Sequence, residues 1–149
     1  MPKVLIADKM SPLAAQIFAT RGIEADVKTG LAPEELQAII AGYDGLAVRS
    51  ATKATAEIIK AADNLKVIGR AGIGVDNIDL DAATERGIVV MNTPFGNSIT
   101  TAEHAIAMMA ALARQIPLAD RSTRAGKWEK SRFMGIELCK KGLGIIGCG

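Results

Sequence analysis

Arg49 is a candidate anion-binding residue in this sequence. It comes directly after the apolar run 45–48, and Ser50 and Lys53 place a hydroxyl and an ammonium group close to it. A guanidinium group can donate two parallel hydrogen bonds to one carboxylate or phosphate. We therefore predict a substrate-binding loop around Arg49, the alternative being an ordinary solvated arginine.

A second candidate is the glycine-rich stretch 69–74, which reads Gly-Arg-Ala-Gly-Ile-Gly and overlaps the end of another apolar run. Glycines allow backbone N–H groups to approach a carboxylate closely. Ile73 and Gly74 could therefore bind an acid group through the main chain. Arg70 could bind the same anion, or it could form a salt bridge with a neighbouring acid. A tight connection without a ligand is the alternative for the whole stretch.

The third candidate is Gly147-Cys148-Gly149, which follows the apolar run 143–146. A strand followed by G-x-G and then a helix begins a dinucleotide-binding unit, because the helix N-terminus binds the pyrophosphate. A lone G-x-G also occurs in ordinary turns. The third glycine and the acidic residue expected about twenty positions further on are not in this sequence.

Apolar runs alternate with helical patterns over the first hundred residues. We expect strands near 4–7, 23–27, 45–48, 67–69 and 88–91, separated by helices near 12–21, 33–41, 55–62 and 79–86. Strands that are apolar on both faces are typical of a parallel sheet covered by helices on both sides. The pattern predicts a flavodoxin-like, doubly wound α/β fold. Ligands of such sheets bind at the carboxyl ends of the strands, where the first two candidates lie.

The pattern changes after Asn97. Thr100 and Glu103 have the spacing of a capping box, and the following run 105–113 is apolar without a break. A helix that is apolar all round must be buried on every side, so we expect it between domains or subunits. His104, the only histidine, lies on this helix and is interpreted as structural. A further helix should begin at Pro117, and the run 143–146 should begin a second sheet.

Composition excludes several other classes of protein. Of the 149 residues 49% are hydrophobic and 23% are charged, as in a globular protein. A net charge of +2 argues against a nucleic-acid partner, and no apolar run has the length of a membrane span or a signal peptide. Cys139 and Cys148 lack the spacing of a zinc site and are expected to be reduced thiols of a cytoplasmic protein.

Seven stretches, in the same order and spacing, resemble the D-isomer-specific 2-hydroxyacid dehydrogenases. They are residues 48–53, 69–77, 91–98, 101–103, 113–117, 126–129 and 143–149. The resemblance implies an NAD-dependent oxidoreductase whose substrate-binding domain is residues 1–97. Residues 98–149 would then contain helices that cross into a Rossmann nucleotide-binding domain and the first strand of that domain. The family's catalytic Arg, Glu and His would follow Gly149, so residues 1–149 alone are expected to be inactive.

The resemblance also implies which residues bind ligands. The substrate would be bound by Arg49, Ser50, Lys53, Arg70, Ile73, Gly74 and Asn97, and the cofactor by Ile73, Thr101, Gly147 and Gly149. A threonine often stands at the position of Ile73, so only the backbone role carries over there. Asn97 could instead cap a helix, and Thr101 could support that cap. The segment 138–142 lacks the glycine-containing turn of the family.

The basic set Arg49, Lys53 and Arg70 favours a phosphorylated 2-hydroxy acid, with 3-phosphoglycerate as the expected substrate. A sister enzyme for glyoxylate or another hydroxy acid is one alternative. A flavodoxin-like binding module without catalysis is another. The resemblance further implies a homo-oligomer formed through the crossover helices, with Lys130 or Arg132 reaching the neighbouring site.

Overall fold

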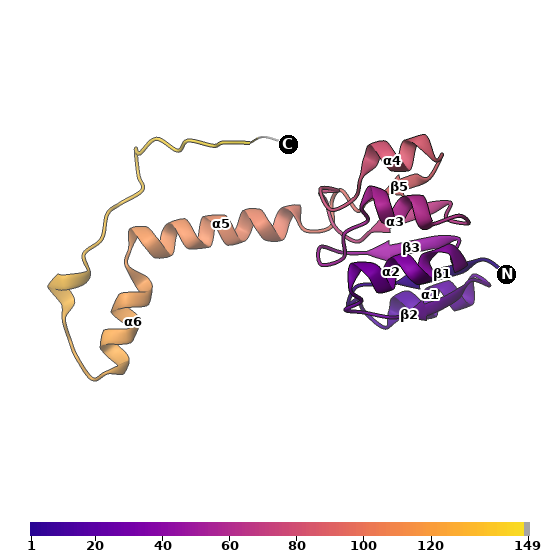
Figure 1. The fold of residues 1–149 in the computed structure, drawn as a ribbon. Coiled ribbons are helices and arrows are strands. Elements are labelled where there is room, and N and C mark those ends of the chain that lie inside the picture. The colour runs from indigo at the N-terminus through magenta and orange to yellow at the C-terminus, as the bar shows by residue number, and fades with distance from the viewer. Residues whose placement is uncertain (148–149) are drawn as a thin grey trace. The chain divides into compact units, whose positions relative to one another are not determined.

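Strands and helices alternate through the first 97 residues of the computed structural model, which describes residues 1–147 (Figure 1). The strands are β1 (Lys3–Ile6), β2 (Glu24–Val27), β3 (Gly45–Val48), β4 (Val67–Arg70) and β5 (Val89–Met91). The helices between them are α1 (Leu13–Thr20), α2 (Pro33–Ile39), the short 3-10 helix η1 (Ile40–Gly42), α3 (Ala56–Ala61) and α4 (Leu80–Glu85). Every strand and helix predicted from this part of the sequence is present.

All five strands are parallel, in the order β2-β1-β3-β4-β5. This order confirms the predicted flavodoxin-like, doubly wound fold. The direction of winding reverses between β1 and β3, and ligands of such sheets bind outside the carboxyl ends of the strands at this reversal. The loop that follows β1 begins at Ala7, and the loop that follows β3 begins at Arg49.

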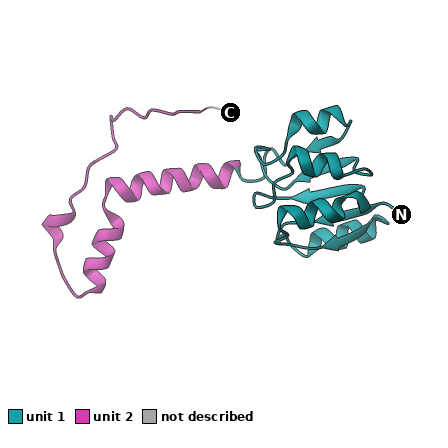
Figure 2. Ribbon diagram, viewed as in Figure 1, with its two compact units in different colours: residues 1–97 teal, residues 98–149 magenta. Residues whose placement is uncertain are grey.

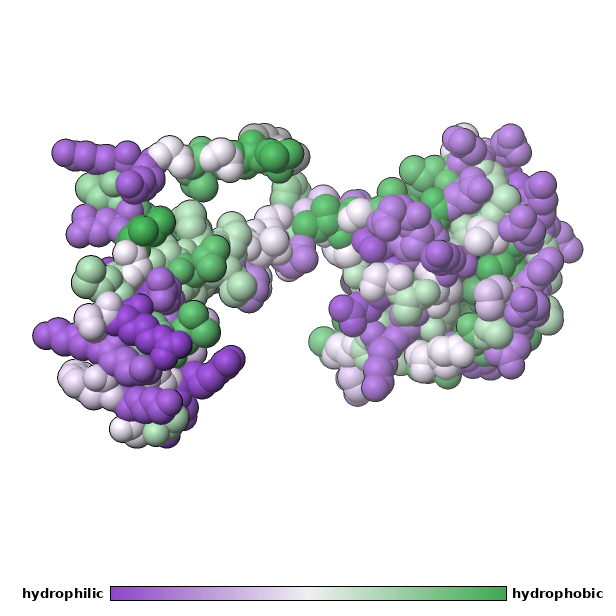
Figure 3. Space-filling model, turned by 60° about the vertical axis from the view of Figure 1, so that its left-hand side comes forward, coloured by the Kyte–Doolittle hydropathy of each residue, from purple (hydrophilic) through white to green (hydrophobic). Residues whose placement is uncertain are grey.

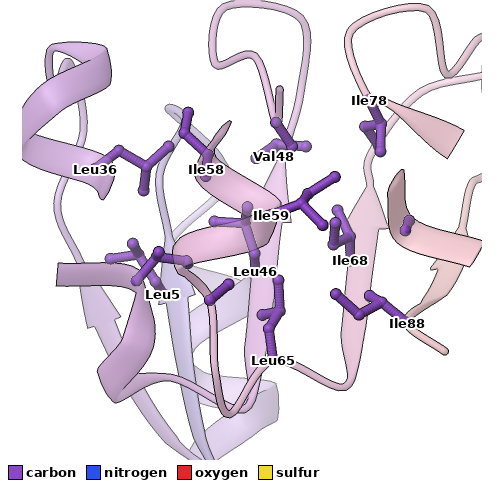
Figure 4. Packing of buried hydrophobic residues seen from close by; sticks show 14 of the residues in the cluster. Leu5, Leu36, Leu46, Val48, Ile58, Ile59, Leu65, Ile68, Ile78 and Ile88 are labelled. Carbon is purple, nitrogen blue, oxygen red and sulfur yellow. The ribbon is translucent and has the colours of Figure 1, made fainter. Parts of the chain in front are cut away.

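A cluster of buried aliphatic side chains lies between the sheet and the helices α2, α3 and α4 (Figure 4). Leu5, Leu46 and Ile68 form one row across the sheet, because the strand register pairs Leu5 with Leu46 and Leu46 with Ile68. These three side chains are at most 2% exposed. Ile59 of α3 packs in the same cluster. Full burial of such a side chain stabilises a fold by about 1.5–3 kcal/mol, so this row holds the central strands and their carboxyl ends in place.

Local signals set several of the helix ends. The Asp79 carboxylate accepts a hydrogen bond of 2.9 Å from the backbone N–H of Ala82 and so caps α4, which begins where the helix 79–86 is expected. Gly87 follows the end of α4 with a φ of +67°, a conformation that glycine adopts without steric cost. The chain therefore turns sharply into β5 at the predicted position.

The chain divides into two compact units, residues 1–97 and 98–149 (Figure 2). The second unit contains α5 (Ser98–Ala113), α6 (Ile116–Arg124) and the short 3-10 helix η2 (Lys130–Phe133). Because α5 begins at Ser98, Thr100 lies inside its first turn, and the predicted capping box is wrong. Asn97 directly precedes the helix, and asparagine suits an N-cap position at least as well as threonine.

One further prediction about the second unit is wrong for the residues that the structure describes. Residues 143–147 form no strand, because a strand needs a partner to satisfy its N–H and C=O groups and no other strand lies between residues 98 and 147. Within the described chain α5 exposes large apolar side chains, with Ile106 and Leu112 62% and 81% exposed. Hydrophobic residues lie at the surface in the space-filling view (Figure 3). Burial of α5 between domains or subunits stays a prediction. His104 is exposed on the same helix.

Candidate functional site

Asp8 organises the carboxyl edge of the sheet. It follows β1 and is only 4% exposed. Its carboxylate accepts hydrogen bonds from the backbone N–H of Arg49 at 2.6 Å, from the backbone N–H of Thr52 at 3.1 Å and from the Thr52 hydroxyl at 2.7 Å. A buried charge is tolerated when it is hydrogen-bonded in this way. The loop that carries Arg49 is therefore folded around a single carboxylate.

These hydrogen bonds determine the ionisation of Asp8. Burial by itself would raise the pKa of the carboxyl group. The hydrogen bonds from the Thr52 hydroxyl and from backbone N–H groups of Arg49, Thr52 and Ala51 outweigh burial and hold the pKa below its ordinary value. Asp8 is thus a carboxylate at neutral pH, and it remains an acceptor for all of its donors.

Arg49 is exposed, but its main chain is held at both ends. Its backbone N–H donates to Asp8, and its carbonyl accepts from Arg70 Nε at 3.1 Å and from Asn77 Nδ2 at 2.8 Å. The guanidinium group donates through Nη1 to the Lys9 carbonyl at 3.2 Å. No other hydrogen bond joins this guanidinium to the described part of the chain, so it has N–H groups available for an anion.

Arg70 connects two of the candidate loops. Its side chain is 11% exposed, and it donates to the carbonyls of Arg49 and Gly74. Its guanidinium also lies 3.8 Å from the Asp76 carboxylate, which matches the salt bridge considered as the alternative for this residue. A Cβ atom at Gly72 would lie 2.6 Å from Arg70 Nη1, so the loop passes close to the arginine because residue 72 is glycine. These contacts give Arg70 a structural role; substrate binding by Arg70 stays a prediction.

The loop after β5 joins the glycine-rich loop. Asn92 Nδ2 donates to the Ile73 carbonyl at 2.7 Å, and the backbone N–H of Thr93 donates to the Gly72 carbonyl at 2.9 Å. The backbone N–H groups of Ile73 and Gly74 make no hydrogen bond to the residues that the structure describes. Two unpaired N–H groups in one exposed loop can bind a carboxylate.

The structure brings together four of the predicted substrate-binding residues through these contacts: Arg49, Arg70, Ile73 and Gly74. Lys53 lines a shallow pocket together with Asp76, Asn77 and Asp79. Ser50 and Asn97 are exposed, and no side-chain hydrogen bond positions either of them within the described chain.

The predicted cofactor residues of the second unit do not form a site in the described chain. Thr101 lies exposed in the first turns of α5. Gly147 has a φ of +93°, and a Cβ atom there would meet no other atom within 4 Å. Gly149 and Cys148 lie outside the described residues. Over residues 98–147 there is thus no strand-turn-helix unit that could hold a pyrophosphate.

Sequence reasoning missed Asp8, Thr52 and Asn77. Asn77 Nδ2 donates to the carbonyls of Arg49 and Thr52, at 2.8 and 2.6 Å, and its Oδ1 is buried without a partner among the described residues. The available signal for Asp8 was a charged residue directly after an apolar strand. It indicated only where the strand ends, because the donors to Asp8 lie more than forty positions away.

Other kinds of site are not supported by the described residues. Between residues 1 and 147 no group of His, Cys, Asp and Glu side chains has an arrangement that could hold a metal ion. None of the helices described is both long enough and apolar enough to cross a membrane.

Comparison with known proteins gives one consistent result. The family profile described as D-isomer specific 2-hydroxyacid dehydrogenase, catalytic domain, matches residues 4–135. The D-3-phosphoglycerate dehydrogenase of Archaeoglobus fulgidus is 58% identical over 147 residues, which is 99% of this chain and 28% of that protein. The D-3-phosphoglycerate dehydrogenase of Homo sapiens is 53% identical over 147 residues, again 28% of its length. The chain therefore spans less than a third of these relatives.

A solved structure supports the same comparison. The NAD+-bound 3-phosphoglycerate dehydrogenase of Entamoeba histolytica superposes with a TM-score of 0.68 at 36% sequence identity. The superposition covers 76% of this chain and 39% of that one. The match thus extends over more residues than the first unit alone contains.

Proposed function

Because the chain belongs to the D-isomer specific 2-hydroxyacid dehydrogenase family, we propose that it is the substrate-binding part of a D-3-phosphoglycerate dehydrogenase. The complete protein would oxidise D-3-phosphoglycerate to 3-phosphohydroxypyruvate with NAD, the first step of serine biosynthesis. The relatives that support this substrate are 50–58% identical to the chain over nearly its whole length. The exposed thiol of Cys139 fits a reducing compartment, and we place the protein in the cytoplasm.

The observation that carries the proposal is the presence of two kinds of anion donor in loops that Arg70 joins at one edge of the sheet. The Arg49 guanidinium lies in the loop after β3, and the unpaired N–H groups of Ile73 and Gly74 lie in the loop after β4. A substrate with one phosphate and one carboxylate has two anionic ends. We propose that Arg49 binds one end and the backbone N–H groups bind the carboxylate.

We propose NAD as the cofactor, on the strength of the family and of the NAD+-bound relative from Entamoeba histolytica. Residues 98–147 do not by themselves form a nucleotide cradle, since Gly147 has open space around it and no strand precedes it. We therefore assign no catalytic step to these residues. The residues of the first unit would bind and orient the acid, and Ile73 would contact both the acid and the nicotinamide end of NAD.

We also propose that the protein is a homo-oligomer formed through α5. The support is the exposure of the large apolar side chains Ile99, Ile106, Met108 and Leu112, each more than half exposed. Lys130 or Arg132 would reach the neighbouring site. Arg132 already pairs with Glu129 at 3.1 Å, so Lys130 of η2 is the residue more readily available to a neighbour.

The test is substrate-dependent reduction of NAD by the full-length protein. Turnover should be highest with D-3-phosphoglycerate, because only this acid carries two anionic ends. D-Glycerate, which lacks the phosphate, is the matched comparison, and glyoxylate with NADH tests the sister activity. Equal kcat/KM values for phosphorylated and unphosphorylated acids would overturn the assignment of a phosphorylated substrate.

A further inference from the structure

We propose that Asp8 is a positioning residue for substrate binding, which acts by holding the main chain of the Arg49 loop. The proposal rests on the proposed function, because it takes this loop as part of the substrate site. Asp8 does not face the ligand itself, since it is 4% exposed and its oxygens are occupied by donors from Arg49 and Thr52.

The hydrogen bonds restrict the loop at each end. One carboxylate oxygen accepts the Arg49 N–H at 2.6 Å, and the other accepts the backbone and hydroxyl groups of Thr52 at 3.1 and 2.7 Å. On the far side of the same residue, the Arg49 carbonyl accepts from Asn77 at 2.8 Å. Both peptide groups of Arg49 are thereby held, and the freedom left to this residue is in its side chain. A guanidinium that starts from a fixed main chain loses less entropy when it binds an anion.

A carboxylate at position 8 is electrostatically unfavourable for the binding of an anion nearby. A neighbouring carboxylate repels an anionic substrate, so a neutral acceptor would suit simple anion attraction better. An amide at position 8 offers only one acceptor oxygen, and its NH2 group would face one of the N–H donors. The carboxylate has acceptor sites for all three donors, which explains why Asp8 suits this position despite its charge.

Asp44 provides a matched control at the opposite edge of the same sheet. It precedes β3, and its carboxylate accepts the backbone N–H of Lys3 at 2.9 Å and the Lys66 ammonium at 2.8 Å. Like Asp8, Asp44 therefore accepts both a backbone N–H and a side-chain donor, here the Lys66 ammonium, but it lies away from the candidate site. A loss of carboxylate at either position should lower stability, whereas only a loss at Asp8 should alter substrate binding.

The experiment measures steady-state kinetics and thermal unfolding of the full-length protein with Asp8→Asn, Asp44→Asn and Arg49→Ala. Asp8→Asn should raise the KM for D-3-phosphoglycerate about tenfold and change kcat and the KM for NAD by less than about twofold. Asp44→Asn should lower the melting temperature without changing either KM. Thr52→Val removes one donor to Asp8 while keeping the side-chain shape, and it should raise the same KM by about threefold. Thr52→Ser keeps the hydroxyl and should therefore have the wild-type KM for D-3-phosphoglycerate.

The outcomes separate this inference from the proposed function. An increased KM in Arg49→Ala together with an unchanged KM in both Asp8→Asn and Thr52→Val would overturn the role of Asp8 and leave the Arg49 site intact. An increased KM in the Asp8 and Thr52 variants with none in Arg49→Ala would support Asp8 but place binding on the loop's other groups. If Asp8→Asn does not fold, the KM values of Thr52→Val and Thr52→Ser test the role of Asp8 on their own. Unchanged KM values in all of these variants would overturn both.

Discussion

Arg49 combines a fixed main chain with an exposed guanidinium. Its N–H and carbonyl groups are bound by Asp8, Arg70 and Asn77, while its side chain makes a single hydrogen bond to the Lys9 carbonyl at 3.2 Å. Arg70, by contrast, uses its guanidinium for hydrogen bonds to the Arg49 and Gly74 carbonyls within the protein. The contrast between the two arginines supports the proposed ligand-binding role of Arg49, whereas Arg70 connects two loops.

Substitution of Arg49 tests this assignment directly. Arg49→Ala in the full-length protein should lower kcat/KM for D-3-phosphoglycerate by roughly ten- to a hundredfold, because a hydrogen bond to a charged group contributes about 1.5–3 kcal/mol. Arg49→Lys keeps the charge but not the forked geometry, so it should recover only part of this loss.

The same variants identify the end of the substrate that Arg49 binds. A loss for D-3-phosphoglycerate much larger than for D-glycerate would place the phosphate at Arg49, and an equal loss would place the carboxylate there. The KM for NAD serves as the control and should hardly change. An unaltered kcat/KM in Arg49→Ala would make Arg49 an ordinary surface residue.

The ionisation of Asp8 predicts a dependence of stability on pH. Its pKa is lower in the folded state than in the unfolded chain, so its contribution is fully present above the unfolded value of about 3.9. This contribution is lost as the pH falls below that value and through the lower pKa of the folded state. Asp8→Asn should therefore be less stable at pH 7 and should lose less further stability between about pH 4 and pH 2. Urea unfolding at several pH values checks this, and parallel pH curves for the two proteins would contradict it.

At the scale of elements, the row formed by Leu5, Leu46 and Ile68 joins the three central strands. The loops that carry the candidate site begin where these strands end. The packing of the row against α3 therefore sets the spacing between the loop after β3 and the loop after β4. The edge strand β5 contributes less to this core, because Val89 and Met91 are 58% and 54% exposed.

Two isoleucines of different burial provide the test at this scale. Ile68 is 0% exposed and Ile17 of α1 is 50% exposed. Ile68→Ala should lower the free energy of unfolding by about 2–5 kcal/mol, because it removes transfer free energy and leaves a cavity. Ile17→Ala should cost less than about 1 kcal/mol, since its side chain is only partly removed from water. Similar losses measured by chemical denaturation of the two variants would contradict the placement of the core.

At the scale of the whole molecule, α5 stands out as an apolar helix without cover. The described chain leaves four of its large side chains more than half exposed, and only Ala113 of this helix is buried. Large exposed apolar surfaces are uncommon on monomeric proteins and mark association sites. The proposed homo-oligomer would cover it with the same helix of a second copy, as two-fold symmetric interfaces do.

Charge placed on α5 should weaken this association. Ile106 is 62% exposed, so Ile106→Lys should not disturb a core within the chain, but it would bury an unpaired charge in the proposed interface. Light scattering should show a shift from oligomer toward monomer at equal protein concentration. Ile17→Lys, at a partly exposed position of α1, is the matched control and should leave the oligomer unchanged. A wild-type protein that stays monomeric at high concentration would rule out the proposed assembly.

The strands, helices and parallel sheet of residues 1–97 could be predicted from the sequence, because each depends on a local pattern. Apolar runs such as 45–48 and 67–69 form strands wherever partners are present, and Asp79 caps α4 through a donor only three positions away. The general position of the site followed from the same reasoning, since the carboxyl ends of parallel strands meet at one edge. Arg49 and the 69–74 loop could therefore be placed near each other before any contact was known.

The tertiary structure decided everything that depends on partners distant in the sequence. The bond from the Arg49 N–H to Asp8 joins residues 41 positions apart, and no local pattern specifies the direction of a buried carboxylate over that separation. The run 143–146 has the composition of a strand but forms none between the described residues, because strand formation requires a neighbour to pair with. Local preference therefore determined which segments can become strands and helices, and the satisfaction of backbone and buried polar groups across the fold determined which of them pair and which side chains meet.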